Sequence, residues 1–268
     1  MESLIVYLLA GVVAGLLGGL FGLGGGAIVV PVLIYSFTFS KFDDAFLTHL
    51  AIGTSLACIV VTSLVSIYTH QRRSAVRWRL ALALMPAIGL GVVAGGVFAT
   101  SVSGVILQLL FGLFLMAVAV QMGFGGHPKS HREIPGPVGA SGAGAGIGFL
   151  SGIFGIGGGS LSVPFLIYCN VPITHAIATS ATLGFPIALL GATTYAFRGW
   201  GVADLPEGAV GFVFLPALVG IVITSIPFAR IGATLAHRLP AENLKRSFAG
   251  VLAVLGLVFV VDNINVGG

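Results

Sequence analysis

The chain has 268 residues, of which 57% are hydrophobic and 7% are charged, and its net charge is +4. Soluble domains carry roughly 25% charged residues, so the composition excludes a soluble fold and predicts an all-α integral membrane protein. The pI near 9.4 does not indicate a nucleic-acid partner, because the lysines and arginines lie in short loops between apolar segments, where they set membrane orientation. We therefore expect a multi-pass protein of the cell membrane, in contact with the lipid bilayer.

Apolar segments long enough to cross a bilayer follow one another along the chain. The N-terminal stretch lacks the basic region of a cleavable signal peptide, so we expect it to belong to the mature fold. A linker rich in glycine, proline and charge, 123–138, separates a first repeat at 1–122 from a second at 139–268. The predicted helical segments are 3–38, 45–69, 79–100, 102–122, 139–169, 174–197, 205–228 and 243–262.

Glycines interrupt the first of these segments, in the sequence "FGLGGGAIVVP" at 21–31. Non-helical backbone survives at membrane depth only inside protein or beside a water-filled cavity. A new helix is predicted to begin near Ala27, and its first N–H groups lack intrahelical partners and carry a partial positive charge. Because glycine lets a ligand approach the backbone closely, such a helix end predicts an anion site.

The broken helix occurs twice. "GLLGGLFGLGGGAIVVPVLIY" at 15–35 aligns with "GFLSGIFGIGGGSLSVPFLIY" at 148–168, and "AIGTS" at 51–55 aligns with "AIATS" at 176–180. The fold is therefore predicted to contain two homologous four-segment halves, each starting with a glycine-broken helix, as in many secondary transporters. A second helix start is expected near Ser160. The glycines before each break are expected to serve close helix packing; they are Gly15, Gly19, Gly148 and Gly152.

The basic residues predict how the halves are oriented. If each broken segment reverses the direction of the chain, the halves are inverted repeats and ten basic residues share one face. The positive-inside rule assigns that face to the cytoplasm and places both chain termini outside it, with Lys41 and Arg198. The ten residues are Arg72, Arg73, Arg77, Arg79, Lys129, Arg132, Arg230, Arg238, Lys245 and Arg246.

Two hydroxyl pairs, Thr54–Ser55 and Thr179–Ser180, occupy equivalent places in the two halves. They either bond back to a carbonyl one turn earlier or donate to a ligand oxygen. His49 and His175 begin the same two segments, where an interfacial role competes with a proton-carrying one. No HExxH motif, intramembrane carboxylate pair or Cys–His cluster is present, so we expect neither an enzyme nor a metal or cofactor site.

The doubled glycine motif, with "AIGTS" and "AIATS", resembles the sulfite exporter TauE/SafE family, also called the toluene sulfonate uptake permease family, over essentially the whole chain. The resemblance implies a secondary transporter of small sulfur-containing anions such as sulfite, thiosulfate, sulfonates or sulfoacetate. It places functional weight on the glycine turns and the Thr-Ser pairs. With the two helix starts, the candidate substrate-binding residues are Gly24, Gly25, Gly26, Ala27, Thr54, Ser55, Gly157, Gly158, Gly159, Ser160, Thr179 and Ser180.

Alternating access between the halves, with export favoured over import, is the resulting functional hypothesis. A passive anion channel and a transporter of non-sulfur organic anions remain alternatives. Protons are a candidate coupling ion, and a homodimer is a candidate assembly.

Overall fold

The computed structural model describes residues 2–21, 25–72, 74–124, 136–236 and 241–266. Within these ranges the chain forms ten helices and one short hairpin of two strands. The first five helices are α1 (Glu2–Phe21), α2 (Gly26–Phe39), α3 (Asp44–Gln71), α4 (Trp78–Ala99) and α5 (Gly104–Phe124). The other elements are α6 (Pro137–Phe154), α7 (Gly159–Tyr168), α8 (Ile173–Arg198), β1 (Ala209–Val210), β2 (Val213–Phe214), α9 (Leu215–Ala236) and α10 (Ala241–Val266).

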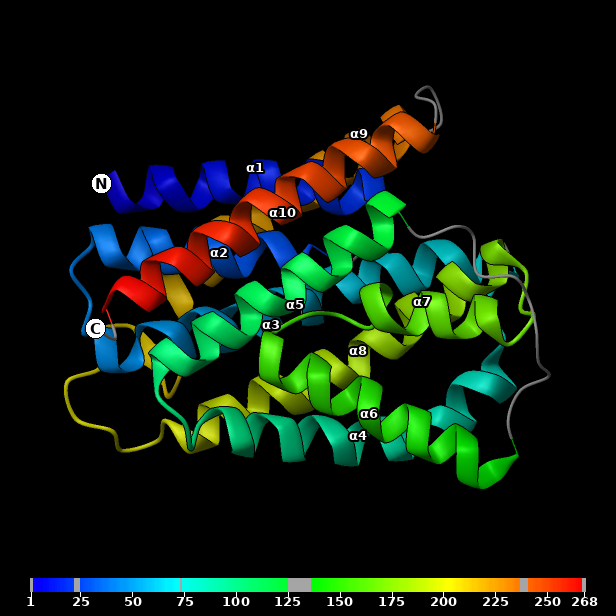
Figure 1. Cartoon of the computed structure of the whole chain (residues 1–268), viewed down its shortest axis with the longest axis horizontal. Coiled ribbons are helices and arrows are strands. Elements are labelled where there is room, and N and C mark those ends of the chain that lie inside the picture. The colour runs from blue at the N-terminus through cyan, green and yellow to red at the C-terminus, as the bar shows by residue number, and fades with distance from the viewer. Residues whose placement is uncertain (1, 22–24, 73, 125–135, 237–240, 267–268) are drawn as a thin grey trace.

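The helices lie roughly along one long axis, and the chain begins and ends at the same end of it (Figure 1). We call this the terminal end; the α2–α3, α4–α5 and α8–α9 connections also lie there. The α3–α4 and α7–α8 connections lie at the opposite end, which we call the basic end. Helices α1 and α6 both stop at glycines, and in each case the next helix runs back the other way.

The basic residues divide between these two ends. Arg198 lies at the terminal end, because its Nε donates to Thr100 Oγ1 over 2.9 Å, just beyond the end of α4. Lys41 lies there too, in the α2–α3 connection. The other basic positions within the described ranges are near the basic end; they are Arg72, Arg77, Arg79, Arg230, Lys245 and Arg246. Arg73, Lys129, Arg132 and Arg238 lie outside the described residues.

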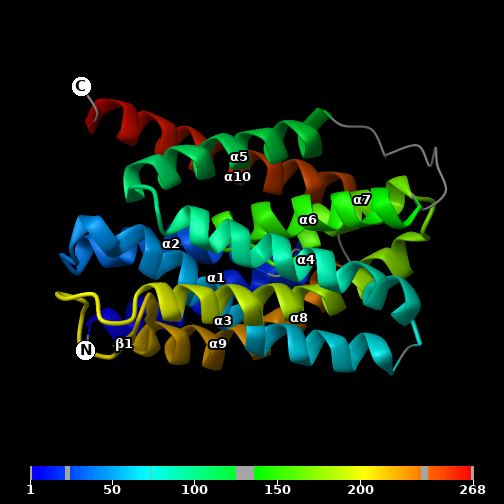
Figure 2. The same cartoon turned by 90° about the horizontal axis from the view of Figure 1, so that it is seen from below.

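The main helix contacts join the first half of the chain to the second. Helix α1 packs along α9, α4 along α6, α3 along α8 and α5 along α10. Figure 2 shows the α5–α10 pair along one edge of the bundle. Glycines allow the close approaches: a Cβ on Gly15 would lie 2.5 Å from the carbonyl oxygen of Ser225, and one on Gly148 would overlap that of Ile88. The expectation that these two glycines serve helix packing is confirmed.

One predicted helix was placed wrongly. The segment 205–228 was expected to be helical from its start, but α9 begins only at Leu215 and continues to Ala236. The residues before it form a loop and the β1–β2 hairpin, in which Gly208 and Gly211 have φ angles of 88° and 55°. The N–H of Phe212 donates to the carbonyl of Tyr195 over 3.2 Å, which ties this loop to α8. Positive φ at two glycines is incompatible with a continuous right-handed helix.

The fold is that of a multi-pass membrane protein. Within the described residues, four helices are long and apolar enough to cross a bilayer, namely α3, α4, α5 and α8. Large apolar side chains on these helices face outward; Leu90, for example, is 75% exposed. A hydrocarbon solvent accounts for such a surface, because in water it would be a large apolar patch.

Candidate functional site

The second glycine break lies between α6 and α7. Helix α6 ends at Phe154, and Gly155 follows in the left-handed conformation with φ 65° and ψ 31°. Its carbonyl oxygen accepts a 2.9 Å hydrogen bond from Ser55 Oγ on α3. Gly158 precedes the first residue of α7, so the amino end of α7 lies within the bundle. All residues from Ser151 to Gly159 are buried.

The first break returns the chain toward the middle of α1. Gly25 caps α2 in the left-handed conformation, with φ 74°. A Cβ on Gly25 would lie 3.5 Å from the carbonyl oxygen of Ala14, well before the end of α1 at Phe21. Helix α2 therefore begins within the bundle and runs back to the terminal end (Figure 1). Gly24, one of the predicted site residues, lies outside the described residues.

The structure brings the two breaks together beside α3. A Cβ on Gly26 would lie 2.7 Å from the carbonyl oxygen of Gly155 and 3.0 Å from Ile59 Cδ1. A Cβ on Gly157 would lie 3.4 Å from Ile59 Cγ2. We call this meeting point, formed by 25–27 and 155–160, the glycine junction. From it α2 runs to the terminal end and α7 to the basic end (Figure 1). The first residue of α2, Gly26, and the turn before α7, at Gly157, both lie beside Ile59.

The two threonines of the hydroxyl pairs bind backbone N–H groups of the opposite half. Thr54 Oγ1 accepts the N–H of Phe214 over 2.9 Å, and Phe214 directly precedes α9. Thr179 Oγ1 accepts the N–H of Arg77 over 3.1 Å, and Arg77 directly precedes α4. Both side chains are fully buried. In this conformation each threonine therefore holds the start of a helix. This partner differs from both partners suggested by the sequence, a carbonyl one turn earlier and a ligand oxygen.

The serines of the pairs differ from each other. Ser55 donates to Gly155, whereas Ser180 Oγ is buried without a hydrogen-bond partner. Sequence reasoning missed Ser151 and Ser162, whose buried hydroxyls near the second break are also unpartnered, like that of the predicted Ser160. The repeat alignment could have revealed these serines, because Ser151, Ser160 and Ser162 occupy positions where the first half has glycine, alanine and valine.

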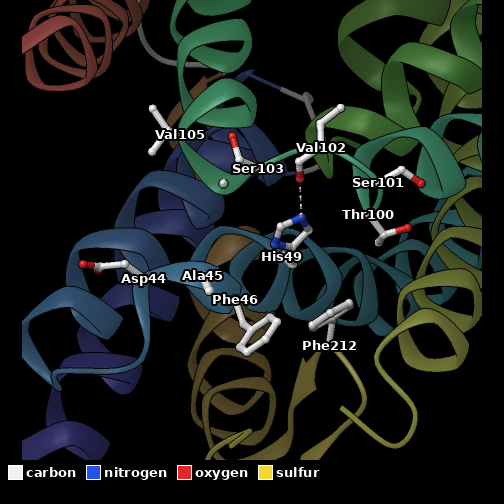
Figure 3. A pocket seen from close by; sticks show the side chains of 11 residues that line it. Asp44, Ala45, Phe46, His49, Thr100, Ser101, Val102, Ser103, Val105 and Phe212 are labelled. Atoms are coloured by element: carbon white, nitrogen blue, oxygen red, sulfur yellow. Dashed lines mark hydrogen bonds between the residues drawn. The ribbon is translucent and has the colours of Figure 1, made fainter. Parts of the chain in front are cut away.

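A hollow of about 490 Å³ opens at the terminal end, between the start of α3 and the α4–α5 connection. Figure 3 shows His49 between Val102 and Phe212 in its wall. His49 Nε2 lies 3.2 Å from the carbonyl oxygens of both Ala99 and Val102, and Nδ1 is buried and unpartnered. His49 is one helical turn from Ile52, which contacts Gly155. The hollow therefore lies on the terminal side of the glycine junction.

His175 has a different setting near the basic end. Its Nδ1 lies 2.8 Å from the carbonyl oxygen of Ala75 in the α3–α4 connection. It thus ties the first turn of α8 to that connection, whereas His49 ties α3 to the connection that follows α4.

The residues of the glycine junction, 25–27 and 155–160, are all uncharged. Every lysine and arginine whose side chain the structure describes is exposed. In the same part of the chain, no group of three His, Cys, Asp or Glu side chains could hold a metal ion. The groups available to a ligand there are hydroxyls and the free N–H groups at two helix starts, which favour an anion.

The sequence is similar to a family of membrane proteins. The model of the family described as "Sulfite exporter TauE/SafE" matches residues 7–259. A Haemophilus influenzae protein named "Probable membrane transporter protein" is 33% identical, over 95% of this chain and 97% of its own length. Similarly named proteins from Methanocaldococcus jannaschii and Bacillus subtilis are 28% and 26% identical, covering 95% and 98% of this chain and 94% and 99% of their own lengths. No solved structure matches the chain.

Proposed function

Since this chain belongs to the sulfite exporter TauE/SafE family of membrane transporters, we propose that it carries small sulfur-containing anions, such as sulfite or a sulfonate, by alternating access. The anion binds at the glycine junction. The observation that carries this proposal is the meeting, inside the bundle, of the amino end of α2 at Gly26 with the turn at 155–158 that leads into the amino end of α7.

The proposed halves are inverted repeats. In support, α1 and α6 begin the two halves and run in opposite directions, and so do α2 and α7 (Figure 1). The packing pairs follow the same relation, because α1 on α9 is the counterpart of α6 on α4. Inverted repeats with a site at their interface are the architecture on which alternating access operates in many transporters.

The anion replaces its lost water with donors that the chain already holds in place. The first N–H groups of α2 and α7 have no intrahelical acceptor, and the amino end of a helix carries about half a positive charge. Glycine at Gly26 and Gly158 keeps side chains away from these groups. Of the predicted binding residues, Ser160 and Ser180 have buried hydroxyls without partners and are the best candidates to bind an oxygen of the anion.

The basic end is the proposed cytoplasmic face, because it holds most of the arginines. The hollow beside His49 then opens outside the cytoplasm, and we propose it as part of the path on that side.

Protons remain the proposed coupling ion, with the buried and unpartnered Nδ1 of His49 as their candidate site. Export is the favoured direction.

Transport by the purified protein in proteoliposomes tests the function. With unlabelled sulfite inside, labelled sulfite outside is expected to accumulate transiently, because exchange through an alternating-access carrier is stimulated from the opposite face. Protein-free liposomes are the control. Flux without such stimulation would favour the channel, and stimulated flux of carboxylates alone would favour a non-sulfur substrate. Folded protein that moves none of these anions contradicts the proposal.

A further inference from the structure

The second break is much richer in free hydroxyl groups than the first. Ser151, Ser160, Ser162 and Ser180 all have buried Oγ atoms without a hydrogen-bond partner. A buried hydroxyl that makes no hydrogen bond is costly, so several in one place call for an explanation. A polar ligand that binds there supplies the missing partners.

Two of these serines, Ser160 and Ser162, lie in the first turn of α7, and Ser180 lies on α8. Ser162 Oγ lies 3.2 Å from the position that a Cβ on Gly158 would occupy, and the backbone oxygen of Ser180 lies equally close to it. Across from them, Gly184 on α8 leaves its Cβ position empty: the nearest atom, the nitrogen of Gly158, is 3.8 Å away. The backbone at Gly158 is thus bordered by the unpartnered hydroxyl of Ser162, by the backbone of Ser180, by Ile187 Cδ1 at 3.1 Å from the same Cβ position, and by a glycine with room for one more atom.

The equivalent residues of the first half cannot form such a site. The repeat alignment places Ala27 and Val29 where the second half has Ser160 and Ser162. The counterpart of Ser180 is Ser55, which already donates to Gly155. Although the helices are arranged symmetrically, hydroxyl donors gather on one side of the glycine junction.

Charge limits what this site can hold. The desolvation cost of an ion rises with the square of its charge, so a dianion costs about four times as much as a monoanion of the same size. Hydroxyls and helix ends offset this cost only in part, and the described lysine and arginine side chains are exposed. Arg77 comes nearest along the chain, through its N–H to Thr179, but its side chain is exposed as well.

We propose that the amino end of α7, with Ser160, Ser162 and Ser180, binds oxyanions as monoanions and discriminates against dianions. This inference rests on the proposed function and specifies the charge state of its substrate. Hydrogensulfite and alkylsulfonates are bound through their oxygens, whereas sulfite dianion and sulfate are rejected because nothing in the site neutralises the second charge.

Binding at two pH values tests the charge state, with thermal stability of the detergent-solubilised protein as the readout, because a ligand of the folded state raises it. Methanesulfonate is expected to bind with the same affinity at both pH values. Sulfate is expected to bind at least tenfold more weakly than methanesulfonate. Sulfite is expected to lose about tenfold in apparent affinity per pH unit above its second pKa. The methanesulfonate series also corrects for titration of the protein. The ionisable groups on α2, α3, α4, α7 and α8 and directly beside them include Tyr35, Asp44, His49, Cys58, Tyr68, His70, Arg77, Arg79, Tyr168, Cys169, His175, Tyr195 and Arg198.

Two variants locate the site. Gly184→Ala is expected to fill the space beside Gly158 and to lower methanesulfonate affinity at least tenfold without loss of stability, because its Cβ meets no atom closer than 3.8 Å. Ser162→Ala with Ser180→Ala is expected to lower it by a similar factor. Ser225→Ala is the control, since that buried hydroxyl on α9 bonds within its own helix and should leave affinity unchanged.

The outcomes separate this inference from the function on which it rests. Sulfate or sulfite dianion binding as tightly as methanesulfonate would overturn the charge selectivity and leave anion transport standing. Unchanged affinity in both site variants would place the anion elsewhere and overturn the site. Folded protein that binds none of the three anions at either pH would remove the proposed function together with the inference.

Discussion

Replacing Gly148 with alanine is expected to destabilise the protein, whereas the same replacement at Gly146 on the same helix is expected to leave it equally stable or slightly more stable. A Cβ on Gly148 would overlap the carbonyl oxygen of Ile88, so α6 and α4 must separate. Close backbone approach at small residues is what holds membrane helices together. We expect a loss of about 1–3 kcal/mol, the usual cost of overpacking.

The measurement is the thermal unfolding temperature of the purified variants in detergent. Gly146 is the matched control because it is exposed, a Cβ there meets no atom within 4 Å, and alanine favours a helix by up to about 1 kcal/mol over glycine. Gly91→Ala approaches the same interface from α4, where its Cβ would overlap the carbonyl oxygen of Ala145. If Gly148→Ala and Gly91→Ala unfold at the wild-type temperature, the α4–α6 contact is not as close as described.

Replacing Thr54 and Thr179 with valine, one at a time, is expected to open the transporter toward opposite faces. Thr54 holds the start of α9, at the terminal end, to α3, and Thr179 holds the start of α4, at the basic end, to α8. Valine keeps the shape but leaves a buried N–H without an acceptor, at a cost of about 1–3 kcal/mol in the closed state. Once that end opens, water can satisfy the N–H, so the equilibrium shifts toward the open form by about 5- to 150-fold.

A single cysteine at the glycine junction reports the two openings. The two native cysteines are replaced in a Cys58→Ala, Cys169→Ala background; both are buried, and burial raises the pKa of the Cys169 thiol, which slows its labelling. In a Ser160→Cys reporter, Thr54→Val is expected to speed labelling by an impermeant thiol reagent from the terminal end. Thr179→Val is expected to speed it from the basic end.

Serine at either threonine position is the control, because it keeps the hydroxyl, and it should leave labelling close to that of the parent. The prediction is contradicted if both valine variants speed labelling from the same face. If neither variant changes the labelling rate, the two hydrogen bonds do not restrain the ends of the bundle.

Sequence patterns anticipated most of the helices but not the start of α9. Long apolar runs identify spans reliably, because a hydrocarbon solvent demands apolar side chains over a fixed length. The stretch before Leu215 is largely apolar, yet Gly208 and Gly211 bend it into a hairpin in which the N–H of Phe212 bonds to α8. Hydropathy cannot distinguish such a loop from a helix, because its last residues, 211–214, are apolar and buried like those of a helix.

The candidate site was anticipated in its backbone and only in part in its side chains. Gly25 and Gly155 adopt the positive φ angles that make glycine necessary at a break. Thr54 and Thr179 are paired across the repeat as expected, but in this structure they accept N–H groups from helix starts far along the chain. Ser151 and Ser162 attracted no attention in the sequence, because a serine in an apolar helix ordinarily bonds to its own backbone.

Composition and repetition alone identify this chain as a membrane protein with two copies of a glycine-rich motif. Composition and repetition are properties of the chain, and they constrain any fold that it can adopt in a bilayer. Three features of the site come from the folded arrangement: Gly26 contacts Gly155, the threonines join opposite halves, and unpartnered hydroxyls lie near the start of α7. Those features depend on which helices pack together, and packing between segments more than a hundred residues apart leaves no local pattern in the chain.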